Sequence, residues 1–124
     1  MVKSYRGLAI VLSEASHARL HAALTLACAA AALGRPVRIF FHGESVAALT
    51  AGRQWQGDAT YRAAGLPSVA DLVENALGLG AQVMACQTGL QLIGVTAASL
   101  SEGIETGGMV AFLADAREDE LVMG

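Results

Sequence analysis

The chain has 124 residues, of which 54% are hydrophobic and only 15% are charged, and its formal net charge is −3. This length suits a single domain spanning residues 1–124. The negative net charge and the scattered lysines and arginines exclude a nucleic-acid partner, which requires a basic surface. The high apolar fraction leads us to expect a homo-oligomer, in which part of the apolar surface faces another subunit.

Two features of the sequence bear on the compartment. The cysteines, Cys28 and Cys86, are too few for a disulfide framework, and the apolar run over residues 8–12 is too short for the core of a signal peptide. We therefore expect a cytoplasmic protein. Residues 75–101 contain no charged side chain. Because glycines and glutamines interrupt this stretch, we expect a buried strand and a packed helix there rather than a membrane span.

The first part of the chain predicts a strand–helix–strand unit. Its apolar runs are continuous, which is typical of strands covered on both faces, and the alanine-rich stretch between them has helical spacing. Gly34 and Pro36 end this helix. We expect strands over residues 6–12 and 37–41, a helix over 16–33 between them and a short helix over 45–49 after them. This order implies a parallel sheet with a right-handed crossover.

Residues 50–67 form the one polar segment, which we expect to be irregular because three glycines interrupt it. It carries Arg53 and the only tryptophan of the chain, Trp55. Long loops in compact domains often act as lids, and this one follows a strand end. We therefore weigh two interpretations: a lid over Cys86, or an ordinary surface loop with Trp55 packed against the body.

The remaining segments alternate between helices and strands, which completes an α/β fold. We expect a helix over residues 68–77, a strand over 81–86, a short helix ending at Gly94, a strand over 104–106, a helix over 109–116 and a strand over 121–123.

Cys86 is the principal candidate for chemistry. It falls at the carboxyl end of a predicted strand, where ligands meet open parallel sheets, and at the start of a helix. The free N–H groups of that helix terminus, around Gln87, Thr88 and Gly89, favour a thiolate. The alternative is a small buried side chain, since free cysteines are usually buried. Cys28 lies within the alanine-rich helix, where we expect it to be buried in the core and unreactive.

Other polar residues follow the first two predicted strands. Glu14 and His17 follow the first strand and His42 and Glu44 follow the second, so these four side chains are candidates to line the same crevice and to move a proton. Glu14, His17 and His21 share one helix face, which we interpret as solvated rather than as a metal site. Phosphate-binding glycine loops and a C-x-x-C motif are absent, so we expect neither a cofactor nor a metal.

Several short motifs, in order, resemble those of the DsrE/DsrF-like family, which includes sulfur-relay and sulfurtransferase proteins. They are ALGRPV (32–37), RIFFHGE (38–44), ACQTG (85–89), LIGV (92–95) and GGMVA (107–111). The resemblance covers nearly the whole chain. It implies a three-layer α/β/α fold with a parallel sheet of about five strands, and assembly into dimers, trimers or larger oligomers.

The resemblance also implies a function. In active members of the family, the cysteine at the position of Cys86 accepts sulfur as a persulfide and hands it to a partner protein. We therefore expect a sulfur carrier or sulfurtransferase with a donor and an acceptor protein as partners. The alternative is a binding or assembly module of the same fold, in which Cys86 is only packed.

Overall fold

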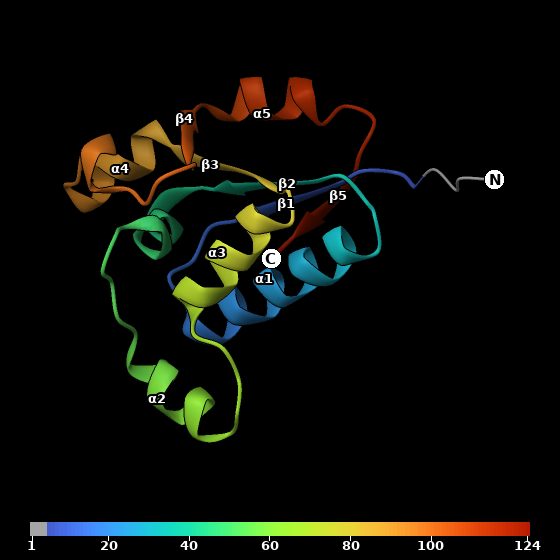
Figure 1. Ribbon diagram of the computed structural model, residues 1–124. Coiled ribbons are helices and arrows are strands. Elements are labelled where there is room, and N and C mark those ends of the chain that lie inside the picture. Colours follow the sequence, from blue (N-terminus) through green and yellow to red (C-terminus); the bar gives the residue numbers. More distant parts are fainter. Residues whose placement is uncertain (1–4) are drawn as a thin grey trace.

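The computed structural model describes residues 5–124, which form one five-stranded sheet (Figure 1). The strands are β1 (Leu8–Leu12), β2 (Val37–Phe41), β3 (Gln82–Cys86), β4 (Glu105–Gly107) and β5 (Glu120–Met123). Their spatial order is β4-β3-β2-β1-β5, and every neighbouring pair is parallel. This confirms the parallel sheet of about five strands expected from the sequence.

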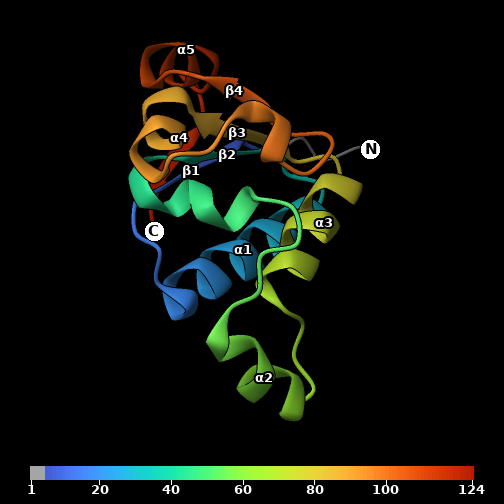
Figure 2. The same cartoon turned by 90° about the vertical axis from the view of Figure 1, so that its left-hand side faces the viewer.

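Helices cover both faces of the sheet. They are α1 (His17–Ala32), α2 (Gln56–Ala63), α3 (Val69–Gly78), α4 (Gln87–Ile93) and α5 (Met109–Asp115), with 3₁₀ helices η1 (Gly43–Leu49) and η2 (Ala97–Ser99). In Figures 1 and 2, α1 and α3 lie on one face and α5 lies on the other, whereas α2 extends beyond α1 and α3. The expected three-layer α/β/α arrangement is therefore confirmed.

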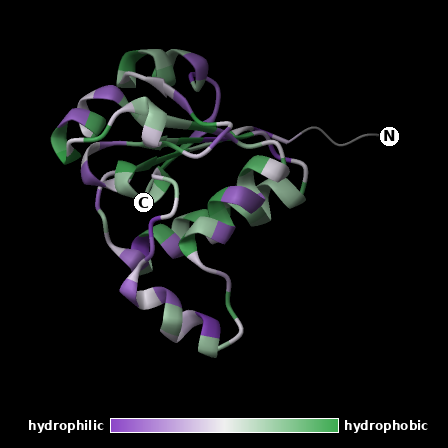
Figure 3. Cartoon of the chain, turned by 60° about the vertical axis from the view of Figure 1, so that its left-hand side comes forward, coloured by the Kyte–Doolittle hydropathy of each residue, from purple (hydrophilic) through white to green (hydrophobic). Residues whose placement is uncertain are grey.

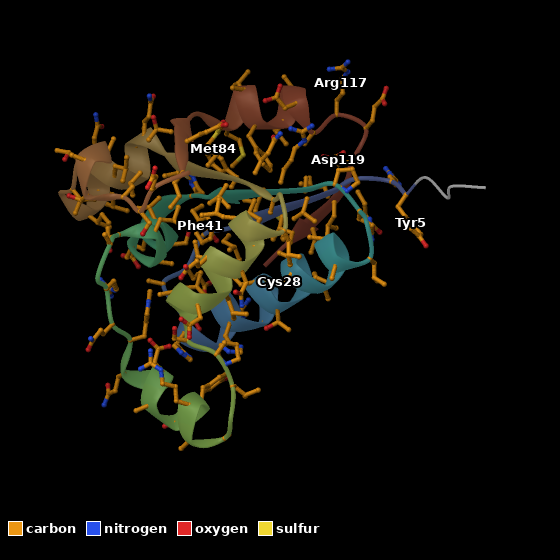
Figure 4. The ribbon with its side chains drawn as sticks, viewed as in Figure 1. Tyr5, Cys28, Phe41, Met84, Arg117 and Asp119 are labelled. Carbon is orange, nitrogen blue, oxygen red and sulfur yellow. The ribbon has the colours of Figure 1, made fainter. Side chains whose placement is uncertain are left out.

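The central strands are apolar on both faces because both faces are covered. Ile10 of β1 pairs with Ile39 of β2, and both are buried. The next residue of β2, Phe40, points to the opposite face and packs against Phe112 of α5, with ring centroids 5.1 Å apart. Figure 3 shows the strands coloured mainly hydrophobic, and Figure 4 shows Met84 on the α5 side of the sheet. Burial on two sides explains why the apolar runs in the sequence are continuous.

The segment between β2 and β3 is more regular than the sequence predicts. Residues 50–67 were expected to be irregular, but Gln56–Ala63 form α2. Glycine disfavours a helix interior, so Gly57 argues against a helix at the level of sequence. In the fold, Gly57 packs against the ring of His17, where an added Cβ would lie 2.6 Å from Nδ1. The close contact with His17 therefore accounts for a glycine at this position of the helix.

Charged groups hold the last strand at the sheet edge. Arg38 of β2 pairs with Asp119, with Nε and Oδ2 3.2 Å apart, and Arg35 pairs with Glu120 at 2.8 Å. Arg6 donates from Nε to the backbone oxygen of Glu118 at 3.2 Å. Partly exposed pairs of this kind each contribute little energy. Because they converge on residues 118–120, they help to place β5 in register beside β1.

The uncharged stretch over residues 75–101 contains β3, α4 and η2, as well as the end of α3. Val83 and Ala85 of β3 are buried in the core, and Gly94 ends α4 in the left-handed conformation, with φ of 75°. The expected strand and packed helix are therefore present in this stretch. No helix among residues 5–124 combines the length and the apolar character that crossing a membrane requires.

A close approach between α4 and η1 positions the start of α4. A Cβ added to Gly89 would lie 2.8 Å from the backbone oxygen of Gly43 and 2.9 Å from Cγ1 of Val46. The oxygen belongs to the main chain, so it cannot move aside as a flexible side chain could. Only glycine at position 89 therefore allows α4, and Cys86 before it, to sit this close to η1.

We predict that Gly89→Ala lowers the free energy of unfolding by about 1–3 kcal/mol, because the added methyl group overpacks this contact. Gly78→Ala is the matched control, since Gly78 also lies in a helix but has no atom within 4 Å of an added Cβ. In the control the change should be neutral or stabilising by up to about 1 kcal/mol, as helix propensity alone suggests. Urea denaturation measures both. Equal destabilisation of the two variants would contradict the prediction.

Candidate functional site

Cys86 is the last residue of β3 and directly precedes α4. Phe41 of β2 pairs with Ala85 of β3, so the residues that follow them, His42 and Cys86, are neighbours at the carboxyl edge of the sheet. On the other side, Cys86 pairs with Gly107 of β4. Three strand ends therefore converge around the thiol, at the edge where parallel α/β sheets bind their ligands.

The thiol of Cys86 is surrounded by hydrogen-bond donors. Its Sγ lies 3.0 Å from Oγ1 of Thr88. Burial by itself raises the pKa of the Cys86 thiol. Hydrogen bonds from the Thr88 hydroxyl, the backbone of Gly89, the side chain of His42 and the backbone of Thr88 outweigh burial and lower this pKa to about 7. Donors that favour the charged form thus make Cys86 substantially ionised at neutral pH.

Exposure of the two cysteines is the reverse of what the sequence suggests. Cys86 was expected to face an open crevice, but it is only 4% exposed, because its side chain turns toward the start of α4. Thr88 and His42 beside it are exposed, so the thiol lies just beneath the surface. Cys28 was expected to be fully buried, but it is half-buried in the seam between α1 and α3 (Figure 4).

The electrostatic environments of the two cysteines also differ. Sγ of Cys28 donates to the backbone oxygen of Leu72, 3.5 Å away. Burial raises the pKa of the Cys28 thiol, and no donor compensates. Cys28 is therefore protonated at neutral pH, whereas Cys86 is partly ionised. Reactivity toward electrophiles follows the thiolate, so the chemical contrast between the two residues favours Cys86 despite its lower exposure.

His42 and Glu44 were both predicted to lie near the thiol. The ring of His42 stacks on Phe40, with centroids 6.3 Å apart and planes 21° apart, and its side chain hydrogen bonds to Cys86. Glu44 is exposed in η1 and lines, with Arg53, an open groove of about 370 Å³. The structure therefore brings His42, but not Glu44, into contact with the thiol.

The histidines of α1 are engaged elsewhere, and the prediction of a solvated helix face is wrong for both. His21 is buried, and His17 donates from Nε2 to Oδ1 of Asp58 over 2.9 Å. Glu14 is exposed and pairs with Arg19, with Oε2 and Nε 3.5 Å apart. Helical spacing correctly placed His17 and His21 on one face, but Glu14 precedes α1 and does not belong to that helix. Helical spacing could not reveal that α2 covers that face, because α2 itself was not predicted.

The possible lid residues lie in the same region. The guanidinium of Arg53 stacks over the ring of Trp55 at 4.5 Å, and Trp55 packs beside His17, with centroids 6.4 Å apart. These contacts are with α1 and with each other. A role of Arg53 and Trp55 in covering Cys86 stays a prediction. Asp58, which sequence reasoning did not single out, is a buried carboxylate of this region. Its one sequence signal is its third position in a helix, where an acidic side chain caps well.

Comparisons with known proteins agree with this architecture. The model of the DsrE/DsrF-like family matches residues 7–122. The crystal structure of YchN from E. coli superimposes with a TM-score of 0.79 at 18% identity, covering 97% of this chain and 100% of YchN. MTH1491 from Methanobacterium thermoautotrophicum gives a TM-score of 0.73 at 14% identity, over 97% of this chain and 100% of that one.

A third structure, BT1422 from Bacteroides thetaiotaomicron, gives a TM-score of 0.68 at 18% identity. The superposition covers 96% of this chain and 95% of BT1422. No curated protein matches the sequence significantly. At identities this low, the superpositions show that the three structures share the fold of this chain, and they show nothing further. The family assignment depends on the sequence match, which extends over nearly all of the residues. The chain belongs to the DsrE/DsrF-like family.

Proposed function

We propose that this protein is a sulfur carrier, which accepts sulfur on Cys86 as a persulfide and passes it to a partner protein. The observation that carries the proposal is the thiol itself, whose pKa of about 7 leaves it partly ionised in a neutral solution. A thiol with a pKa near the ambient pH combines thiolate content with nucleophilicity. Membership of a family that includes sulfur-relay proteins supports the same function.

The chemistry is two exchanges at sulfur. The Cys86 thiolate attacks the outer sulfur of a donor persulfide, so that the donor S–S bond breaks, a new S–S bond forms on Cys86 and the donor leaves as a thiolate. A thiolate of the acceptor protein then attacks the outer sulfur on Cys86, which restores the Cys86 thiolate. One sulfur atom moves in each step, and no external oxidant or reductant is consumed.

His42 is the residue best placed to assist these exchanges. Its side chain hydrogen bonds to Cys86, and the residue is exposed. A histidine ring can carry a proton, so His42 can supply one to a departing thiolate. His17 was an equal candidate by sequence, but its Nε2 is committed to Asp58. We therefore assign the proton transfer to His42 alone.

A second function is favoured by one observation, the 4% exposure of Cys86. A packed cysteine in an assembly or binding module would show the same burial. Such a cysteine, however, is ordinarily protonated, since burial without donors raises its pKa. The donors from Thr88, Gly89 and His42 support the carrier function, because they stabilise a charge that a packing role does not need.

Alkylation of Cys86 in a Cys28→Ala variant should therefore depend on pH with a midpoint near 7. The rate rises with pH because only the thiolate reacts, and the midpoint lies below the ~8.5 of a free cysteine. Thr88→Val, which keeps the shape of the side chain but removes the hydroxyl donor, should move the midpoint upward. The rate with iodoacetamide at a series of pH values measures this. A midpoint at or above ~8.5, or no labelling of the folded protein, would support the packed-cysteine function.

Incubation with a persulfide donor should add one sulfur atom to the protein, and Cys86→Ser should abolish that addition. The swap is nearly isosteric, so circular dichroism and size should be unchanged. Cys28→Ala should still accept sulfur. The Cys28 thiol that this change removes is protonated at neutral pH, so it is not expected to be the acceptor. Mass spectrometry of the intact proteins distinguishes these outcomes. Sulfur retained by Cys86→Ser would show that the acceptor is a different residue.

We also propose that the chain forms a homo-oligomer through the face that α5 covers only in part. Four large apolar side chains are exposed on α5 and β5: Val110, Leu113, Leu121 and Met123. Met123 pairs with Val11, which pairs with Phe40 under α5, so Met123 points to the α5 side of the sheet. It is 68% exposed, and Val110 is 85% exposed. A second subunit would remove this apolar surface from water.

Light scattering at micromolar concentration should accordingly give a mass that is a multiple of the 12.7 kDa chain. Replacing Val110 and Met123 by glutamate should shift the species toward that of a single chain, because charges at an interface core are costly. Glutamate at the exposed Ala51, which follows η1 and belongs to neither α5 nor β5, serves as the control. A single 12.7 kDa species for the unmodified protein would refute the assembly.

A further inference from the structure

Residues 53–64, which include α2, form an arm between two glycines. Gly52 and Gly65 have φ of 76° and 81°, in the left-handed region that glycine adopts most easily. Neither has an atom within 4 Å of an added Cβ. Figures 1 and 2 show that α2 lies beyond α1 and α3, away from the sheet. The 53–64 arm is therefore joined to the body by two permissive, unobstructed positions.

The arm is attached in an unusual way. A helix ordinarily docks by burying an apolar stripe, but the only buried residue of α2 is Asp58. The carboxylate is 5% exposed and accepts three hydrogen bonds. Its Oδ1 accepts from Nε2 of His17 at 2.9 Å and from the N–H of Val69 at 3.2 Å, and its Oδ2 accepts from the N–H of Trp55 at 3.3 Å. One side chain thus ties the arm to α1 and to the start of α3.

Aromatic contacts complete the attachment. The ring of Tyr61 meets His17 edge-on, with centroids 4.6 Å apart, and it lies 4.5 Å from His21. His21 donates from Nε2 to the backbone oxygen of Pro67 at 3.0 Å. Tyr61 and Trp55 are both partly buried, and Trp55 packs against the hydrophobic core, so these rings also contribute to holding the arm. Within α2 itself, Asp58 is the one fully buried side chain, and its hydrogen bonds are the polar part of this attachment.

We infer that the 53–64 arm is a clasp, locked to α1 by the Asp58 carboxylate, which opens as a unit while the sheet stays folded. Elements with little apolar burial open locally at a lower free energy than the core. Opening also alters a neighbouring groove, because Arg53 of the arm lines that groove together with Glu44 and Ile93. The clasp therefore controls the shape of a surface near the carboxyl edge of the sheet, and it does so independently of sulfur transfer.

The test compares Asp58→Asn with a matched control, Asp71→Asn. Both aspartates stand third in a helix and accept from the backbone of the N-cap residue, but Asp71 is exposed and caps only α3. Asparagine at 58 loses the charge and turns an N–H toward donors, so the clasp should open. Trypsin should then cut Asp58→Asn at Arg53 or Arg62 about tenfold faster than it cuts the unmodified protein, as loss of a charged hydrogen bond implies. Arg38, which lies in the sheet, should stay protected from cleavage. The emission of Trp55, the only tryptophan, should shift to the red.

Two results would overturn the inference: cleavage of Asp58→Asn no faster than that of Asp71→Asn, or cleavage that reaches Arg38 at the same rate as the arm. Hydrogen exchange of the unmodified protein provides a test that does not depend on the variant folding. Amides of α2 should exchange together and at least about tenfold faster than those of β1 and β2, as a local opening requires. Exchange of α2 at the rate of β2 would show that the arm opens only with the whole domain.

Discussion

The candidate site depends on the burial of β2 and β3 on both faces. Because α1 and α3 cover one face and α5 covers the other, these strands pair in register, Phe41 beside Ala85. The residues that follow, His42 and Cys86, are then forced to be neighbours at the carboxyl edge. The close contact between Gly89 of α4 and η1 adds a third group to His42 and Cys86, since it holds the N–H of Gly89 near the thiol. Packing in the core therefore determines the chemistry at the edge.

Cys86 combines two properties that usually oppose each other. Burial disfavours a thiolate, yet donors from a side chain, a helix start and an imidazole stabilise it. The thiolate lies just beneath two exposed residues, Thr88 and His42. Cys28, more exposed yet protonated, shows that accessibility alone does not create a reactive cysteine.

The two helical layers on the α1 side of the sheet are held by different forces. α1 and α3 bury apolar side chains against the strands, whereas α2 buries one carboxylate. Apolar packing is spread over many contacts, so it resists local opening. An attachment that depends on one hydrogen-bonded charge is lost as a whole when that charge is lost. The same domain can therefore contain a rigid site at Cys86 and a separable arm at Asp58.

The sequence by itself determined β1, β2 and β3, because their continuous apolar runs are typical of strands buried on both faces. It also determined that Cys86 stands between a strand and a helix whose first residues, Thr88 and Gly89, supply donors. Tertiary structure alone decided that α2 exists, that His17 and His21 are covered, and that Cys86 is buried while Cys28 is partly exposed. Local periodicity shows which face of an element is apolar. It does not show which distant segment covers that face, such as α2 over His17, where a Cβ at position 57 would collide with the ring.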